Sequence, residues 1–188
     1  MTDLVLEPTS TAQWQALVAE AAQRCDCRLD EDLESYLVFL LMRFIKRPDL
    51  AGRRMAMEYL HSLRVTGQLQ LDQLRDVGDQ CLLFSGFYPR LAERRLVRVA
   101  YFVDLGRSAY GLAAERIRHA GSDLYAALAS GFVGLMDVLQ AMRALPGEPA
   151  LDALAAMELW QDTGSRAARR QLERLTGATP LPPDRGRH

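Results

Sequence analysis

Apolar side chains recur along almost the whole chain with the spacing of an α-helix, in which residues three or four positions apart share one face. The segment after Asp30 shows this pattern most clearly, and its inner stripe consists of Leu33, Leu37, Leu40, Leu41 and Phe44. Val38, Phe39 and Met42 add apolar residues on the other sides, so we expect this helix to be central. The periodicity predicts helices packed around one apolar core.

Prolines, glycines and capping residues interrupt the pattern and set the expected helix ends. Pro48 stops the second helix, Gly67 separates the third from the fourth, and Ser165 is placed to cap the last one. The predicted helices cover about residues 10–25, 30–47, 49–65, 69–84, 89–119, 122–142, 150–162 and 165–176. The fifth is either continuous or broken near Gly106, and residues 63–71 form the one stretch that leaves room for a β-hairpin.

The sequence therefore predicts an all-α, single, bundle-like domain of seven or eight helices over residues 1–176. A chain of 188 residues can build one core without disulfide or metal support. Residues 177–188 are rich in proline and glycine, so we expect a disordered tail there. Small residues inside the predicted helices, among them Gly106, Gly131 and Gly134, predict close contacts between helices.

Composition narrows the class of protein without naming a partner. The net charge of −1 at pH 7 argues against a nucleic-acid partner, which would favour a strongly basic protein. Three cysteines fit no disulfide framework and favour a reducing, cytoplasmic location. The longest uninterrupted apolar run, Tyr36 to Met42, is far shorter than the roughly 20 residues of a membrane span, so no membrane helix is expected.

Charges are unevenly distributed along the chain. Between Pro89 and His119 seven arginines face three acids, whereas the first 42 residues hold eight acids and two arginines. One interpretation is that two solvated faces attract each other within the fold; the other is a basic surface for an anionic ligand or partner. The last predicted helix is also basic, through Arg166, Arg169, Arg170 and Arg174, and we expect these residues on a solvated outer face.

Polar residues set into the apolar pattern between Asp76 and Ala114 form the strongest candidate site. A turn over Ser85–Tyr88 would fold the fourth and fifth helices back on each other and bring Asp79 near Arg94 or Arg95, because a buried polar group needs a partner. The cluster is either a structural network or a polar pocket or partner groove. The candidate ligand- or partner-binding residues are Asp79, Phe87, Tyr88, Arg94, Arg98, Tyr101, Asp104 and Tyr110.

A metal site is a weaker alternative. Glu58 and His61 have the Glu-x-x-His spacing that di-iron bundles use twice, and Glu115 and His119 share a helix face four residues apart. A second Glu-x-x-His pair is absent from the sequence. We therefore interpret these residues as surface pairs and predict no metal.

Cys25 and Cys27, which are separated by one residue, are a candidate redox pair. Because neighbouring acids would raise a thiol pKa and lower its reactivity, we expect Cys25 in the core and Cys27 as an unreactive loop thiol. Cys81 lies among apolar neighbours and is expected in the core.

No catalytic motif stands out. Ser85-Gly86 lies outside any Gly-x-Ser-x-Gly pattern, and Lys46, the only lysine, follows no glycine-rich phosphate loop. These absences favour a protein that is not an enzyme, and no cofactor is predicted.

Two segments, LFSGFYP at 83–89 and YFVDLGRSAYGLAA at 101–114, resemble those of a set of uncharacterised bacterial all-helical proteins. The shared features are a Ser-Gly-Phe turn, an aromatic pair, a glycine and an Ala-Tyr pair, here Ser85-Gly86-Phe87, Tyr101-Phe102, Gly106 and Ala109-Tyr110. Phe102 departs from a paired-tyrosine pattern. The resemblance implies a bacterial, cytosolic protein and supplies no activity.

Two functions remain open. The first is a protein-interaction or regulatory module that binds an unidentified protein partner and could form a homodimer. The alternative is a helical bundle with an internal small-molecule or metal site.

Overall fold

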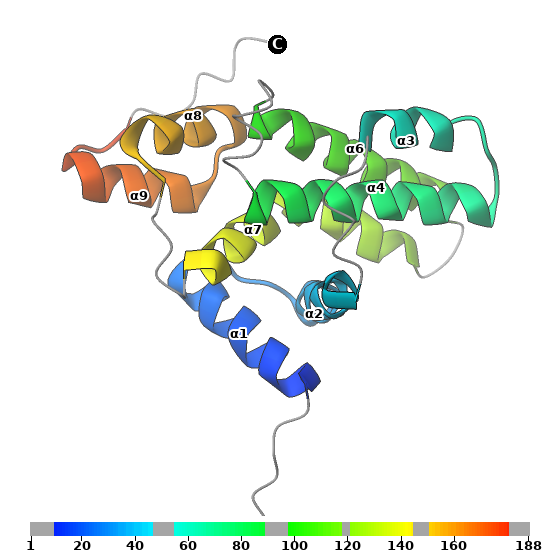
Figure 1. Ribbon diagram of the computed structural model, residues 1–188, viewed down its shortest axis with the longest axis horizontal. Coiled ribbons are helices and arrows are strands. Elements are labelled where there is room, and N and C mark those ends of the chain that lie inside the picture. The colour runs from blue at the N-terminus through cyan, green and yellow to red at the C-terminus, as the bar shows by residue number, and fades with distance from the viewer. Residues whose placement is uncertain (1–9, 47–54, 89–97, 118–120, 145–150, 181–188) are drawn as a thin grey trace, which may run out of the picture.

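The computed structural model describes residues 10–46, 55–88, 98–117, 121–144 and 151–180, which contain eight α-helices and no strand (Figure 1). The helices are α1 (Ser10–Arg24), α2 (Glu31–Lys46), α3 (Met55–Ser62), α4 (Gln68–Phe87), α6 (Val99–Arg116), α7 (Gly121–Ala144), α8 (Ala153–Thr163) and α9 (Arg166–Thr176). The predicted all-α fold is confirmed for this part of the chain. Residues 63–71, where a hairpin was conceivable, form a turn and the first residues of α4.

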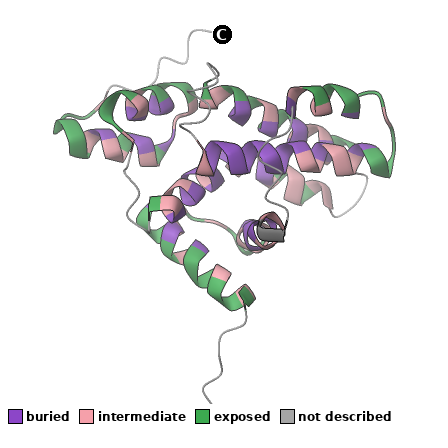
Figure 2. Cartoon of the chain, viewed as in Figure 1, coloured by how far each residue is buried: buried purple, intermediate pink, exposed green. Residues whose placement is uncertain are grey.

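Helices α4, α6 and α7 form the centre of the domain and pack against one another along much of their length (Figure 1). Helices α1 and α2 lie on α7, and α3 lies on α4. Helices α8 and α9 form a hairpin at one end of the molecule, opposite the end that carries α3. Buried residues run along α4 and α7 (Figure 2), and the largest of them include Phe84, Leu82, Tyr110, Phe132 and Leu135.

Gly106 shows why the small residues are needed where α6 crosses its neighbours. A Cβ atom at this position would lie 2.4 Å from Cε2 of Phe132 and 2.9 Å from Cβ of Cys81. Helix α6 therefore passes Gly106 without a break and touches α7 and α4 directly. This agrees with the predicted close contact and excludes a break at Gly106. The helix predicted over residues 89–119 is nevertheless shorter than expected, because α6 begins at Val99, after Arg98 in an extended conformation, and ends at Arg116.

Several helix ends lie where capping residues predicted them. Asp30 Oδ1 accepts a hydrogen bond from the Leu33 N–H at 2.8 Å, and Ser165 Oγ accepts one from the Ala168 N–H at 3.0 Å. Gly177, in the left-handed conformation with φ of +66°, ends α9. Residues 181–188 of the predicted tail lie outside the described residues.

The predicted turn at Ser85 and Gly86 is wrong, because both residues belong to α4, which continues to Phe87. The Ser85 hydroxyl donates to the carbonyl oxygens of Cys81 and Leu82, at 2.8 and 3.1 Å. Both acceptors lie within the same helix, so a buried serine is satisfied there and does not end it.

Helix α7, with 24 residues, is long and apolar enough to cross a bilayer by length and composition alone. The sequence analysis expected no membrane helix and did not consider this segment. Its most apolar window has a mean hydropathy of 1.4. A core helix meets the same criteria, and α7 contacts α1, α2, α4, α6 and α9 within this domain.

Candidate functional site

The carboxylate of Asp79, which is 1% exposed, joins three helices. Its Oδ1 accepts hydrogen bonds from the Tyr36 hydroxyl of α2 at 2.6 Å and from the Tyr110 hydroxyl of α6 at 2.7 Å. Its Oδ2 is bonded by the guanidinium of Arg43, also from α2. The structure thus brings Asp79 and Tyr110 together, and the arginine seen on Asp79 is Arg43, which the sequence analysis did not consider.

The Asp79 carboxylate is shielded from water, and both of its oxygens are hydrogen-bonded. Burial raises the pKa of Tyr110 and of Tyr36, so both hydroxyls keep their protons and act as donors. Gly78 makes room for the network, because a Cβ there would lie 2.4 Å from Cε1 of the Tyr110 ring. This arrangement fits the structural interpretation, a polar cross-link between α2, α4 and α6.

The aromatic residues Phe87 and Tyr88 are half-buried. The Phe87 ring stacks on Phe44 of α2, with centroids 6.3 Å apart and planes at 15°. Tyr88 packs against Phe84, at a centroid distance of 6.2 Å. Both residues therefore help to fill the core, one of the two roles considered for them.

The other predicted site residues that the structure describes do not converge with Asp79. Arg98 is exposed and bonds both carboxylate oxygens of Asp162 in α8, at 3.1 and 3.2 Å. Tyr101 and Asp104 are also exposed. Arg94 lies outside the described residues.

The residues considered for a metal are engaged elsewhere or dispersed. Glu58 accepts a hydrogen bond from Gln80 at 3.1 Å, and His61 Nδ1 lies 3.3 Å from the Gln73 side-chain oxygen. Glu115 is exposed, and His119 lies outside the described residues. No group of three or more His, Cys, Asp or Glu side chains suited to a metal occurs in the described part of the chain.

A second buried carboxylate, Asp137 of α7, ties α9 to the core. It is 4% exposed; its Oδ1 accepts a hydrogen bond from the Ser165 hydroxyl at 2.5 Å and its Oδ2 one from the Ala167 N–H at 3.2 Å. Burial raises the pKa of Asp137 to about 6, although these hydrogen bonds at the start of α9 oppose the shift. The sequence analysis missed this residue, whose signal is a single acid within the apolar run from Phe132 to Leu139.

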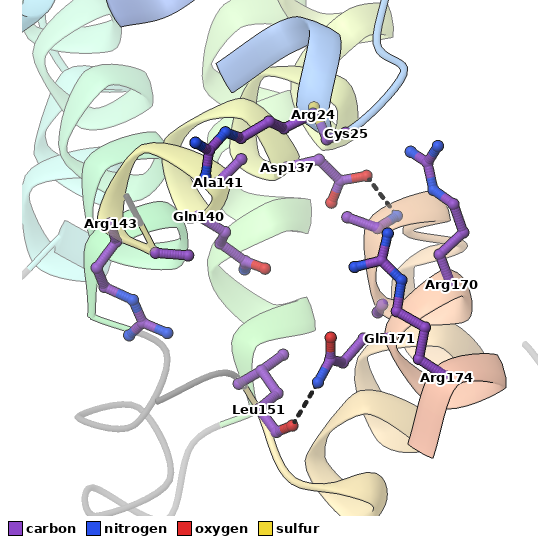
Figure 3. Close-up of a pocket in the computed structure, with 13 residues that line it drawn as sticks. Arg24, Cys25, Asp137, Gln140, Ala141, Arg143, Leu151, Arg170, Gln171 and Arg174 are labelled. Atoms are coloured by element: carbon purple, nitrogen blue, oxygen red, sulfur yellow. Dashed lines mark hydrogen bonds between the residues drawn. The ribbon is translucent and has the colours of Figure 1, made fainter. Parts of the chain in front are cut away.

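Beside Asp137 lies a cavity of about 220 Å³, which we call the arginine pocket (Figure 3). Its walls come from α1, α7 and α9, and they contribute four cationic side chains: Arg24, Arg143, Arg170 and Arg174. Gln140 and Gln171 add amide groups, and Gln171 donates a hydrogen bond to the Leu151 carbonyl at 3.4 Å. Figure 3 shows Arg143 and Gln140 on one side of the pocket and Arg170 and Arg174 of α9 on the other.

Arginines outnumber acids among the described residues that line this pocket. Asp137 is the one acid among those residues, and its oxygens are already bonded by Ser165 and Ala167. Arg24 pairs with Glu20 at 2.9 Å, and Arg170 Nη1 lies 3.6 Å from Asp26. Arg170 Nη2 is buried and has no hydrogen-bond partner, which is costly for a guanidinium nitrogen.

The sequence drew attention to Arg170 and Arg174 but did not predict a pocket there. Arg174 is exposed, as expected for a solvated outer face, whereas Arg170 is partly buried; both line the cavity with residues from two other helices. Their spacing of four residues was the available signal, since it puts both guanidinium groups on one side of α9.

A second cavity, of about 640 Å³, shares Cys25 and Asp137 with the arginine pocket and is also lined by Cys27, Gly134 and Arg166. The interaction with the Cys25 thiol and the Arg166 charge lower the pKa of Cys27, against burial and the charges of Asp137 and Asp26. The expectation that neighbouring acids dominate is therefore wrong for Cys27. The pKa of Cys25 is raised by the interaction with Cys27 and by burial.

Comparisons with known proteins return no match: no family model, curated protein or solved structure is similar to this chain.

Proposed function

We propose that this protein is a helical binding module whose ligand is a small, multiply charged anion, a phosphate or polycarboxylate compound, held in the arginine pocket. The observation that carries the proposal is the placement of four arginines from three helices around one cavity, in which the one acid among the described lining residues is already hydrogen-bonded. The proposal develops the internal ligand site considered from sequence and places it at different residues.

The chemistry of guanidinium groups supports an anionic ligand. Arginine presents paired N–H donors that match phosphate and carboxylate oxygens, and the bonds are stronger than those between neutral groups. A cavity of about 220 Å³ is below the usual range of roughly 300–1,000 Å³ for drug-sized ligands, so a compact anion fits it better.

The lining residues support binding more than catalysis. Cys25 is the one nucleophilic side chain among the described residues of the pocket, and its raised pKa keeps it as a thiol.

Calorimetric titration of the whole protein with pyrophosphate tests this function. We expect saturable binding at one site, and Arg170→Gln or Arg174→Gln should weaken it by about tenfold or more, since each removes charge-assisted hydrogen bonds. Arg98→Gln is the matched control, because Arg98 pairs with Asp162 outside the pocket. Citrate in a parallel titration separates a preference for phosphate from one for carboxylate.

Thermal unfolding of each variant, recorded without ligand, shows whether it is folded. Folded pocket variants that bind pyrophosphate as tightly as the wild type would contradict the proposal. So would a wild-type protein that binds neither pyrophosphate nor citrate.

A second candidate is self-association through α3, which one observation favours. Met57, Leu60 and Leu63 follow one another at helical spacing and are 61%, 52% and 48% exposed, and Leu69 at the start of α4 is 57% exposed. We call these four residues the α3 stripe. Arg64 and Asp72 lie next to it along the chain, so a two-fold axis could set opposite charges of two copies against each other.

Light scattering over a range of protein concentrations tests self-association. We expect a dimer that Leu60→Glu dissociates, while Leu154→Glu, at a 70% exposed position of α8, leaves it intact. A wild-type protein that stays monomeric at the highest concentration would remove this candidate.

A further inference from the structure

The end of α1 folds so that two thiols line one cavity. The Asp26 N–H donates to the Gln23 carbonyl at 3.1 Å and the Cys27 N–H to the Ala22 carbonyl at 2.9 Å, which is the hydrogen-bond pattern of a Schellman motif. Asp26 takes the left-handed position, with φ of +50°, where glycine or asparagine is usual. This reversal turns the chain between Cys25 and Cys27, and both residues line the cavity of about 640 Å³.

The two thiols differ in their surroundings. Cys25 is 5% exposed and also lies within 3.6 Å of the Ala22 carbonyl oxygen, whereas Cys27 is half-exposed and opens into the cavity of about 640 Å³. Arg28 and Arg166 line the same cavity. Gly134 of α7 leaves room for the Cys27 sulfur, because a Cβ there would lie 2.9 Å from it. One thiol is thus accessible and the other is held behind it.

We propose that Cys25 and Cys27 form a reversible redox site, in which Cys27 reacts first with a peroxide and Cys25 then closes an intramolecular disulfide. The inference does not depend on the anion-binding function.

The chemistry needs one two-electron oxidant, a peroxide such as H₂O₂. The Cys27 thiolate attacks one peroxide oxygen, the O–O bond breaks, and the products are a sulfenic acid at Cys27 and hydroxide. The Cys25 thiol then attacks the Cys27 sulfur, the S–O bond breaks, and the disulfide forms with release of water. Two molecules of a monothiol such as glutathione return the site to its reduced form: the first opens the disulfide to a mixed disulfide, and the second displaces the protein thiol and leaves as glutathione disulfide.

Electrostatics assigns the order of the two steps. The interaction with the Cys25 thiol and the Arg166 charge favour the thiolate of Cys27, against burial and the charges of Asp137 and Asp26. At neutral pH Cys27 therefore carries more thiolate than an ordinary cysteine, whereas Cys25 and Cys81, whose pKa values burial raises, do not.

Peptide mapping of the wild-type protein tests the site without any substitution. Trypsin cleaves after Arg24 and Arg28, so both thiols fall in one peptide, Cys25–Arg28, that excludes Cys81. After brief treatment of the folded protein with H₂O₂ and blocking of free thiols, we expect this peptide to carry no block and to have lost two hydrogens. Reduction should restore both blocking sites, and Cys81 should remain blocked throughout.

Two variants identify the role of each thiol. Cys25→Ser removes the resolving thiol, so the sulfenic acid at Cys27 should persist and react with dimedone, which should not label the wild type. Cys27→Ser should leave Cys25 at least about tenfold slower to oxidise than Cys27 is in the wild type, because Cys25 is buried and protonated. A Cys25–Arg28 peptide that keeps both thiols after peroxide, or a disulfide found only between two chains, would overturn the proposal.

Discussion

The Tyr110 hydroxyl donates a hydrogen bond of 2.7 Å to Oδ1 of Asp79, although the two residues stand 31 positions apart in the chain. The same oxygen accepts the Tyr36 hydroxyl, and Oδ2 is bonded by Arg43. Because Asp79 and Tyr110 are buried, each depends on the other for its hydrogen bonding. Their pairing fixes the positions of α2, α4 and α6 relative to one another.

Removing the Asp79 charge should destabilise the fold strongly. Asp79→Ala leaves the Tyr110 hydroxyl and the Arg43 guanidinium without their acceptor, so we expect a loss of about 2–4 kcal/mol in the free energy of unfolding by urea. Asp76→Ala, three residues earlier on α4, is the control, because Asp76 pairs with Arg75 near the surface and should change stability by less than about 1 kcal/mol. Equal losses in both variants would contradict the structural role of Asp79.

Two glycine substitutions should act in opposite directions. Gly78→Ala would place a Cβ 2.4 Å from the Tyr110 ring, and overpacking of this kind costs about 1–3 kcal/mol. Gly111→Ala in α6 meets nothing within 4 Å, so the better helix propensity of alanine should stabilise the protein by up to about 1 kcal/mol. Melting temperatures of the two variants check this; a stabilising Gly78→Ala would mean that α4 and Tyr110 are not in close contact.

Asp137 should make stability fall as the pH rises. Its pKa is about 6 in the folded protein against 3.8 for an ordinary aspartate, so the unfolded chain loses this proton first. Between about pH 4 and pH 6 the folded state binds more protons than the unfolded state, and the resulting loss of stability is about 3 kcal/mol.

Asp137→Asn lacks this titration and isolates the effect. The free energy of unfolding of the variant minus that of the wild type should therefore increase by about 3 kcal/mol from pH 4 to pH 7. Denaturant unfolding at both pH values measures it, and a difference that stays constant with pH would show that Asp137 ionises normally.

The same carboxyl should influence the arginine pocket. Ionised Asp137 adds a negative charge to the pocket wall, so Asp137→Asn should bind pyrophosphate several-fold to about tenfold more tightly than the wild type at pH 7.5. At pH 5 the wild-type carboxyl is largely protonated and the two proteins should bind alike. Calorimetry of both proteins at the two pH values checks this; comparison at equal pH cancels the protonation of pyrophosphate itself.

The sequence contained enough information for the helices and less for the site. Period and caps predicted α2 and α9, because these signals are local, and the cost of burying unpaired polar groups placed Asp79 and Tyr110 in one polar cluster. The serine at position 85 misled the prediction, since a buried hydroxyl can bond the carbonyl of Cys81 in its own helix. The periodicity within one helix does not show which other helix supplies the hydrogen-bond partner of a buried residue. Asp79 of α4, for example, is bonded by Arg43 of α2.

The arginine pocket illustrates the same limit. Arg24, Arg143 and Arg174 lie on three helices that are far apart in the chain, and only the packed fold brings them to one cavity. Asp137 carried a local signal, an acid inside an apolar stripe, which predicts a buried partner but not its identity.

A crystal structure of the protein grown with pyrophosphate tests the central claim most directly. The account predicts pyrophosphate in the arginine pocket, with its oxygens within hydrogen-bond distance of Arg170 and Arg174. Pyrophosphate bound elsewhere, with the arginine pocket empty at a saturating concentration, would contradict it.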